Sequence, residues 1–203
     1  RLHVALQGVG LLDAAWQKAH AYAQDRRQMR APGSAGPAPD VIMAHPAVKR
    51  MLDTQRAWVD GGRVLAYQTA IELDVGKFGA GALQTQAQQW CALVTPIMKS
   101  IFSHQAFHGG SDCLQVFGGH GFVREWGVEQ IVRDARVTMI YEGTNTIQSL
   151  DLLGRKVLPN QGATLKKFGE QITPLVLEEQ GNEAMAEFIK PLAPQELNGQ
   201  AAR

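Results

Sequence analysis

Apolar residues recur at helical spacing along most of the chain, and no run shows the alternation of a β-strand. In residues 1–27 the repeating apolar positions are Val4, Leu6, Val9, Leu12, Ala15, Trp16, Ala19 and Ala23. This pattern predicts an amphipathic helix that ends at the charged cluster 25–27. The same pattern predicts further helices from Pro46 to the glycines at 76–81, over 82–117, over 127–136, from Asn145 to Pro159, and from Gly162 to about Ile189.

Proline and glycine mark the ends of these predicted helices. The segment 28–45 contains three prolines and two glycines, which exclude a regular helix. Because it is longer than a usual connection, we expect this loop to be either mobile or functional. In the next helix, Pro46 suits the first turn and Gly61-Gly62 is a weak spot. Thr95-Pro96 has the form of a cap followed by a first helical residue, so the region 82–117 is either one helix or two in line.

The two helices after residue 127 each have a predicted inward face. For the helix over 127–136 this face is Val128, Ile131, Val132 and Ala135, and Glu129 and Arg133 form an i, i+4 ion pair on the outer face. At the start of the next helix, Asn145 and Gln148 have the spacing of a capping box. Its predicted inward positions are Ile147, Leu150, Leu153 and Val157.

These elements predict an all-α protein. We expect an antiparallel, four-helix-type bundle over residues 1–160, followed by a C-terminal helical extension over 161–203 with a disordered tail from Pro191. Hydrophobic residues make up 45% of the chain and charged residues 19%, as in ordinary globular domains. The chain begins at Arg1 inside a helical pattern, so we expect it to be cut from a longer protein. Pattern and composition on their own predict a helical domain and no activity.

Charge, hydropathy and cysteine usage exclude several classes of partner. The formal net charge of +1 gives no reason to expect a nucleic acid or an anionic membrane. No apolar stretch approaches the roughly 20 residues needed to span a bilayer, so we expect no membrane segment. From the cysteine usage we expect a cytoplasmic location. Cys91 and Cys113 form no CxxC motif, and we expect two free, inert thiols. His104, His108 and Asp112 share i, i+4 spacing, but ligands on consecutive turns diverge too far to close on one ion, so we expect no metal site.

Two short segments could carry chemistry, although each also has a simpler structural explanation. The glycines in residues 115–122, Gln-Val-Phe-Gly-Gly-His-Gly-Phe, let backbone amides approach a bound phosphate, or they form a helix C-cap and a turn. In residues 140–145, Ile-Tyr-Glu-Gly-Thr-Asn, Glu142 lies just before a helix N-terminus and beside a glycine. Taken alone, it is either a general base or a surface acid favoured by the helix dipole.

Together, the two segments and the residues between them resemble the acyl-CoA dehydrogenase family. The family pattern is a Gln-x-x-Gly-Gly-x-Gly-Phe run, a Val-Glu helix, an Arg-Asp-Ala step, then Ile-Tyr-Glu-Gly-Thr and Ile-Gln. Residues 115–148 match this pattern nearly throughout. The resemblance extends more loosely back to Arg1. The helix ending at residues 25–28 resembles a family helix that ends in Glu-Arg and a basic residue, and His45 resembles the His that opens the family's next helix.

The resemblance implies an FAD-dependent enzyme that oxidises acyl-CoA thioesters to trans-2-enoyl-CoA. Glu142 matches the catalytic base, Gly143 matches a residue at the thioester end of the acyl site, and Arg1 matches the end of a substrate-contacting segment. A thioester α-proton is weakly acidic, so a base works best in a site that becomes dry, where burial raises a carboxylate pKa from about 4.3 toward neutral. In the family the backbone N–H of the base and a flavin ribitol hydroxyl stabilise the enolate charge, and the β-hydride passes to flavin N5.

The resemblance also implies a set of flavin contacts and partners. The positions that match FAD contacts are Arg26, Arg27, Gln28, His45, Gln115, Gly118, Gly119, Thr144, Asn145 and Thr146. Residues 144–146 match positions near the flavin, whereas segments 26–28 and 115–119 match those that hold the cofactor across a subunit interface, the latter its ADP part. We therefore expect a homodimer or homotetramer, with acyl-CoA as substrate and electron-transfer flavoprotein as electron acceptor.

Several positions depart from the common pattern of the family. Pro46 follows His45 where a Gln that touches FAD is common, and proline has no N–H to offer. Arg30 stands where Gly is frequent, and Ser149 stands where Arg is usual. With the longer loop and the extra helical segment, these traits resemble the longer bacterial branch of the family, which includes methylmercaptopropionyl-CoA dehydrogenases.

Two other hypotheses stay open. An acyl-CoA oxidase would share the base and the fold, but its reduced flavin would react with oxygen and form hydrogen peroxide. A helical assembly domain that has lost its catalytic role is the second alternative, and the intact Glu142-Gly143-Thr144 run argues against it. Because the family's N-terminal helical domain and β-domain are not in this chain, we expect the isolated chain neither to hold FAD tightly nor to turn over.

Overall fold

The computed structural model describes residues 1–192 and divides into two compact units, Arg1–Leu152 and Leu153–Arg203. The first unit contains α1 (Leu2–Asp25), α2 (Pro46–Phe78), α3 (Gly81–Val116), α4 (Val128–Thr138) and α5 (Asn145–Asp151). The second contains α6 (Ala163–Glu179) and α7 (Ala186–Leu192). No β-strand occurs within residues 1–192, so the predicted all-α fold is confirmed.

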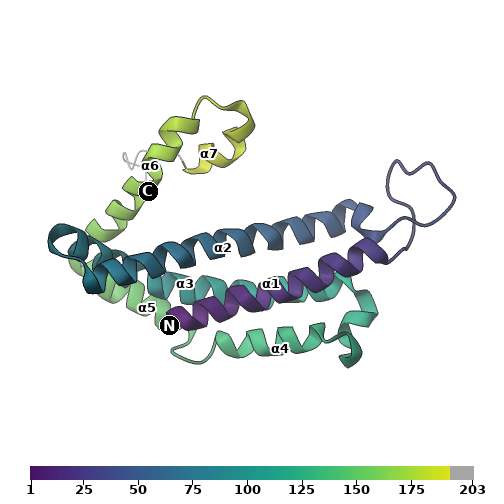
Figure 1. Cartoon of the computed structure of the whole chain (residues 1–203), viewed down its shortest axis with the longest axis horizontal. Coiled ribbons are helices and arrows are strands. Elements are labelled where there is room, and N and C mark those ends of the chain that lie inside the picture. Colours follow the sequence, from purple (N-terminus) through teal and green to yellow (C-terminus); the bar gives the residue numbers. More distant parts are fainter. Residues whose placement is uncertain (193–203) are drawn as a thin grey trace, which may run out of the picture. The chain divides into compact units, whose positions relative to one another are not determined.

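Four helices of the first unit lie side by side as an up-and-down bundle (Figure 1). Helices α1 and α3 run parallel, because Gly8 packs on the backbone of Phe102 and Tyr22 stacks on Phe117. Helix α2 runs the opposite way, since Trp16 Nε1 donates to the carbonyl oxygen of Leu52 at 3.0 Å, near the start of α2. Helix α4 is antiparallel to α3 and also contacts α1. The bundle therefore has two ends, and each end brings together residues that lie far apart in the sequence.

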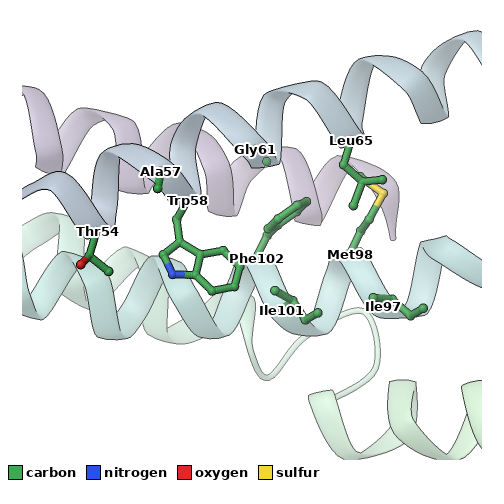
Figure 2. Close-up of a pocket in the computed structure, with 10 residues that line it drawn as sticks. Thr54, Ala57, Trp58, Gly61, Leu65, Ile97, Met98, Ile101 and Phe102 are labelled. Atoms are coloured by element: carbon green, nitrogen blue, oxygen red, sulfur yellow. The ribbon is translucent and has the colours of Figure 1, made fainter. Parts of the chain in front are cut away.

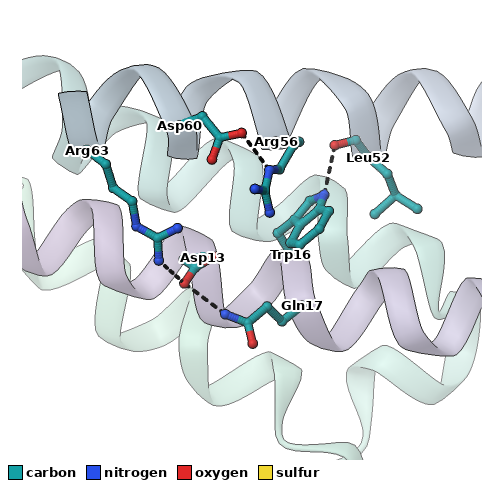
Figure 3. Close-up of polar contacts among 7 residues, drawn as sticks. All are labelled: Asp13, Trp16, Gln17, Leu52, Arg56, Asp60 and Arg63. Atoms are coloured by element: carbon teal, nitrogen blue, oxygen red, sulfur yellow. Dashed lines mark hydrogen bonds and ion pairs between the residues drawn. The ribbon is translucent and has the colours of Figure 1, made fainter. Parts of the chain in front are cut away.

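Polar contacts fix the register between α1 and α2 (Figure 3). Arg63 Nη2 and Gln17 Nε2 both donate to Asp13 Oδ2, at 2.7 Å and 2.8 Å. One turn of helix away, the Arg56 guanidinium lies over the Trp16 ring at 4.7 Å and also pairs with Asp60. Because Asp13 is largely buried, its two partners offset the cost of taking the carboxylate out of water.

An apolar cluster fills the end of the bundle where α1 and α3 finish. It joins the alanine face of α1 to the last turn of α3 and the first turns of α4, and it consists of Ala15, Ala19, Ala23, Ile42, Leu52, Cys113, Val116, Phe117, Val128 and Ile131. Small alanines let α3 approach α1 closely, and the larger side chains fill the space around them. This packing holds the glycine-rich segment that follows α3 in a defined place.

The long helices are more continuous than the sequence predicts. Helix α2 runs without a break through Gly61-Gly62 and Gly76 and ends only at Phe78, so the weak spot is no interruption. The open question at Thr95-Pro96 resolves in favour of one helix, because Pro96 lies inside α3. Thr95 Oγ1 donates to the carbonyl oxygen of Cys91 at 2.6 Å, and buried residues on both sides of the proline anchor the helix in the core.

The inward face predicted for α4 is present in the structure, whereas the inward face predicted for α5 is not. Val128, Ile131 and Ala135 are buried, and Arg133 Nε pairs with Glu129 at 2.7 Å as predicted. The inward residues predicted for this helix were wrong, since Ile147 and Leu150 in α5 and Leu153 after its end are about half exposed or more. Polar Gln148 and Asp151 are buried in their place, because this face of α5 covers polar groups of α1 and α3.

The second unit is small and is described by itself. A π-helical turn, Leu152–Val157, leads to α6 and α7, in which Val176 and Ile189 are buried. Pro191 and Leu192, where the sequence predicts the start of a disordered tail, belong to α7, and the rest of that tail lies outside the described residues. The domain boundary at residue 160 stays a prediction.

Candidate functional site

Residues 139–145 form the tight connection between α4 and α5, which we call the Glu142 loop. The N–H of Asn145 donates to the carbonyl oxygen of Met139 at 3.2 Å and closes the loop. Glu142 has a backbone φ of 53° and Gly143 one of 85°, so two successive residues adopt the left-handed conformation. For a residue with a Cβ this costs about 1–2 kcal/mol. The side chain of Glu142 is exposed, so contacts elsewhere in the loop must hold its backbone.

The buried side chain of Gln148 makes two of these contacts. Its Nε2 donates to the carbonyl oxygen of Glu142 at 3.3 Å and to that of Gly143 at 3.0 Å. Both partners can only accept, so the orientation of the Gln148 amide is determined. A Cβ at position 143 would lie 2.7 Å from Gln148 Nε2, and the positive φ disfavours any side chain there. Gly143 is therefore required both by its conformation and by the close approach of Gln148.

The side chain of Asn145 ties the same loop to α3. Its Oδ1 lies 3.1 Å from Lys99 Nζ and 3.1 Å from Ser103 Oγ, and its Nδ2 donates to the carbonyl oxygen of Ser100 at 3.2 Å. The predicted capping box at Asn145 and Gln148 was wrong, because the N-cap is Thr144, whose hydroxyl accepts from the N–H of Ile147 at 3.4 Å. Both capping-box residues instead use their amides to hold the loop.

The start of α1 lies beside the Glu142 loop. Arg1 Nη1 lies 2.5 Å from Asp151 Oδ2 in α5, and the hydroxyl of Tyr141 donates to Gln7 Oε1. These two contacts place Arg1 and Glu142 at the same end of the bundle. Thr144 and Thr146 are exposed at this end, whereas the side chain of Asn145 is directed toward α3. The predicted substrate residues and the predicted flavin-proximal residues therefore share one neighbourhood.

A cavity of about 580 Å³ at the other end of the bundle collects most of the remaining candidates. Its lining includes Arg26, Gln28, His45, Gln115, Gly118 and Gly119. A Cβ at Gly118 or Gly119 would meet nothing within 4 Å, and Gly118 has a φ of 58°. The glycines there leave the backbone open toward a ligand rather than filling a gap in the core. A guanidinium, two amide side chains and an imidazole form a donor set suited to an anionic group.

The segment between α1 and α2, expected to be mobile or functional, makes backbone hydrogen bonds and supplies part of the lining of this cavity. Arg27 and Val41 form an isolated antiparallel bridge, and the N–H of Gln28 donates to the carbonyl oxygen of Asp40 at 3.0 Å. His45 Nε2 lies 2.9 Å from the carbonyl oxygen of Gln28, which joins two of the predicted contacts. Arg27 Nη1 instead donates to the carbonyl oxygen of Pro39, so its side chain braces the loop.

An aromatic cluster beside this cavity was not found by sequence reasoning. Tyr22 stacks on Phe117, with ring centroids 4.3 Å apart, and meets Trp126 edge-on. His120 stacks on Trp126, and its Nδ1 lies 2.9 Å from the hydroxyl of Tyr22. These residues come from α1, the end of α3 and the turn before α4, so no local spacing reveals them. They fix the Gly118–Gly119 turn from one side.

The two groups of candidate residues lie at opposite ends of the bundle. Arg1 precedes α1, whereas Arg26 follows it, and α1 has 24 residues. At about 1.5 Å per residue, a helix of this length separates the two groups by about 36 Å. One chain therefore carries two groups of candidate residues, one around Glu142 and one around the cavity, that do not meet within the chain.

Lys99 is a further site residue that sequence reasoning missed. It is fully buried in α3, with an exposed fraction of 0%. Burial, followed by the nearby charge of Arg1, lowers the pKa of the Lys99 ammonium. A sequence signal did exist, because Lys99 shares the helical stripe of Phe102 and Ala106, which are core residues. A lysine on an apolar stripe is unusual and marks a position where charge is retained in the core.

A separate apolar groove lies between α2 and α3 (Figure 2). It has a volume of about 530 Å³ and is lined by Thr54, Ala57, Trp58, Gly61, Gly62, Leu65, Ile97, Met98, Ile101 and Phe102. Beside it, an exposed stripe follows one side of α2: Val64, Tyr67, Ile71 and Phe78 are 59–73% exposed. Large contiguous apolar surface of this kind is typical of protein contacts. The lining of the groove contains no charged side chain, so the groove offers no chemistry of its own.

The remaining candidates carry no site within the described part of the chain. Among residues 1–192, no group of three or more His, Cys, Asp or Glu side chains is placed to hold a metal ion. The rings of His104 and His108 lie 4.1 Å apart between centroids and are tilted by 40°, while Asp112 accepts from Gln55. Both cysteines are free thiols, as predicted, and burial raises the pKa of Cys113 to about 12. No described helix has the length and apolar character to cross a bilayer.

Comparison with known proteins shows the family of this helical domain. The family model for the acyl-CoA dehydrogenase C-terminal domain matches residues 1–158. The chain therefore belongs to the acyl-CoA dehydrogenase family, and this region is its C-terminal helical domain. The resemblance inferred from residues 115–148 is confirmed.

The named relatives are longer than this chain. The chain is 43% identical over 173 residues to a 3-methylmercaptopropionyl-CoA dehydrogenase from Ruegeria pomeroyi, which covers 85% of this chain and 29% of that protein. It is 33% identical to a broad-specificity linear acyl-CoA dehydrogenase from Mycobacterium tuberculosis, covering 90% of this chain and 31% of that protein. The solved butyryl-CoA dehydrogenase of Megasphaera elsdenii matches with a TM-score of 0.59 and 27% identity, over 76% of this chain and 35% of that one.

Proposed function

We propose that this chain forms the base-bearing helical part of an FAD-dependent acyl-CoA dehydrogenase, with Glu142 as the general base. The observation that carries the proposal is the Glu142 loop itself. The exposed carboxylate belongs to the first of two successive left-handed residues. Two side-chain amides of α5 hold that backbone in place, Gln148 through the loop carbonyl oxygens and Asn145 through the carbonyl oxygen of Ser100 in α3. A surface acid at a helix start would need neither the strain nor the buried contacts.

The loop also offers a hydrogen-bond donor for the substrate. Within residues 1–192, no protein group accepts a hydrogen bond from the backbone N–H of Glu142. A thioester carbonyl bound there would meet this donor while the Glu142 carboxylate takes the α-proton, so the growing negative charge on oxygen would be stabilised. Arg1, held by Asp151 at the same end, adds positive charge near this neighbourhood.

The cavity at the other end has the properties needed to hold the ADP part of FAD. The guanidinium of Arg26 and the open backbone at Gly118-Gly119 suit a pyrophosphate, and the amides of Gln28 and Gln115 add polar contacts. His45 also lines the cavity, whereas Pro46 after it has no N–H to donate. When bound, the flavin supplies the acceptor for the β-hydride.

The separation of these two groups of candidate residues, the two half-sites, supports a shared active site between chains. The Glu142 end and the Arg26 end lie about 36 Å apart along α1, so the cavity of one chain serves the Glu142 loop of another. The groove and stripe on α2 and α3 provide apolar surface for contact between chains. The match spans only 29–31% of the relatives' length, so we expect the 203-residue chain by itself neither to retain FAD nor to turn over.

The base is tested by replacing Glu142 with Gln in the full-length protein. The amide has nearly the same shape but cannot take a proton, so exchange of the substrate α-proton should fall by about 10²-fold or more. Flavin content and unfolding midpoint should stay at the wild-type values, because the side chain is exposed. Unchanged α-proton exchange would leave the chain as an assembly domain without a catalytic role.

The shared site is tested by mixing two inactive variants. Glu142→Gln removes the base, and Arg26→Glu opposes an anionic cofactor at the cavity. If the two half-sites come from different chains, a mixed oligomer contains one site with both wild-type halves, and turnover returns. If one chain supplied both halves, every site would remain defective and the mixture would stay inactive.

The substrate and acceptor are proposals of the same kind. Similarity to a 3-methylmercaptopropionyl-CoA dehydrogenase makes short thioether acyl-CoA esters the first substrates to assay, with linear acyl-CoA esters as the comparison. We expect electron transfer to an electron-transfer flavoprotein. Hydrogen peroxide formed in proportion to substrate, with no added acceptor, would instead assign the protein to the acyl-CoA oxidases.

A further inference from the structure

We propose that the buried Lys99 and the half-buried Asn145 form a positioning pair that sets the backbone of the Glu142 loop. The pair joins the middle of α3 to the first residue of α5, three positions after the proposed base. The inference rests on the proposed function for its catalytic consequence, but its structural part can be tested without any activity.

The contacts of the pair are directional. Lys99 Nζ can only donate, and the carbonyl oxygen of Ser100 can only accept, so Oδ1 of Asn145 faces Lys99 and Nδ2 faces Ser100. Ser103 Oγ lies 3.1 Å from the same Oδ1 and brings a second polar group to it. The Asn145 amide is therefore held in one orientation and cannot shift along α3 without losing several contacts.

This arrangement is costly for stability, which argues that it has another role. Lys99 is fully buried, near Arg1 and beside the start of a helix, where a positive charge is disfavoured. A hydrophobic residue at this position would pack without any of these costs. Buried polar groups of this kind are retained where they determine one conformation of a neighbouring segment.

The Glu142 loop is the segment that needs such help. Local sterics oppose the left-handed conformation of Glu142. Two contacts hold the loop in it: Gln148 donates to the carbonyl oxygens of Glu142 and Gly143, and Lys99 donates to Asn145 just after them. Among residues 1–192, Oε1 of Gln148 has no hydrogen-bond partner, so Gln148 holds the loop through the hydrogen bonds of its Nε2 alone. Removing Lys99 would leave Oδ1 of Asn145 without its charged donor and free the loop to relax.

The structural test uses amide hydrogen exchange of the chain as it stands. Lys99→Met removes the charge and keeps the length of the side chain, and Asn145→Ala removes the partner at a half-buried position. In both variants, exchange of the backbone amides at positions 141 and 145, which donate to the carbonyl oxygens of Val137 and Met139, should quicken by about tenfold, while the middle of α1 keeps its protection. Met98→Ala, a neighbouring core change away from the loop, is the control and should leave exchange of the loop unchanged. Unchanged exchange in Asn145→Ala would overturn the proposal.

The functional test is a double-mutant cycle in the full-length protein. Lys99→Met and Asn145→Ala should each lower α-proton exchange about tenfold at saturating substrate, with a small change in KM, because the base is displaced rather than removed. The double variant should be no worse than either single one, since the two residues act through one contact. A hundredfold loss in the double variant would show independent effects and refute the pair.

The two tests separate the failure of this inference from the failure of the proposed function. If Glu142→Gln leaves α-proton exchange intact, the proposed base is wrong, yet faster amide exchange in Asn145→Ala still supports the positioning pair. If Glu142→Gln abolishes the reaction while both positioning variants keep full activity and loop protection, the base stands and the pair is refuted.

Discussion

At Gly8, helix α1 packs directly against the backbone of α3. Replacing Gly8 with Ala therefore tests how closely these two helices pack. A Cβ at this position would lie 2.6 Å from the carbonyl oxygen of Phe102 and 3.1 Å from the backbone nitrogen of Ser103. Backbone atoms cannot turn aside as a side chain can, so the two helices must separate. Overpacking of this kind costs about 1–3 kcal/mol.

The same helix supplies a matched control at Gly10. A Cβ there meets nothing within 4 Å, so Gly10→Ala should only gain helix propensity, about 1 kcal/mol. Gly8→Ala gains the same helix propensity, but its new Cβ forces α1 away from the backbone of α3. Its free energy of unfolding should therefore be about 1–3 kcal/mol lower than that of Gly10→Ala. Urea unfolding of both variants, followed by circular dichroism, measures the difference directly. Equal stability of the two variants would refute the close packing of α1 on α3.

Three further predictions concern other parts of the molecule. Cys113 should react with a thiol reagent at about pH 8 only after unfolding, because burial, and then the charge of Asp112, raises its pKa to about 12; rapid labelling of the folded chain in a mass spectrum would contradict this. The N–H of Ala31 donates to the Asp40 carboxylate and holds its pKa below the ordinary value of 3.8. The contact therefore stabilises the folded loop above pH 3.8, and this stabilisation is lost as the pH falls through the lowered pKa. Asp40→Asn should therefore speed tryptic cleavage after Arg30 at neutral pH, and an unchanged rate would argue against the contact. Tyr67→Asp with Ile71→Asp should reduce the mass of the full-length protein in light scattering from an oligomer to a single chain, and an unchanged mass would exclude this stripe as the contact.

The spacing of apolar residues predicted the buried face of a helix well where apolar side chains fill that face. It predicted the face poorly where polar side chains are buried. Most positions of the predicted stripes of α1 and α4 are buried, because alanine, valine and isoleucine at helical spacing have one favourable environment. Leu6 is the exposed exception in α1, with 42% of its surface exposed. The face of α5 was predicted wrongly, since the same rule placed Ile147 and Leu150 inward. Gln148 and Asp151 occupy that face, and their partners on other segments are invisible to a local pattern.

The candidate site could be inferred in part from order along the chain. The run from 115 to 148 indicated the family and, through it, Glu142 and the glycines at 118–119. Order along the chain could not show that the Glu142 loop and the cavity lie at opposite ends of α1. That separation follows from the direction of each helix in the bundle, which depends on contacts between distant residues such as Gly8 and Phe102.

The sequence by itself determined that the chain is helical, where most helices begin and end, and which residue types could do chemistry. These properties depend on neighbours within a few positions, where propensity, proline, glycine and apolar spacing act. Only the tertiary structure decided that Lys99 is buried, that its partner is Asn145, and that the backbone of Glu142 is left-handed. Those properties arise where three helices meet, because the cost of burying a charge or straining a loop is offset only by partners brought together through folding.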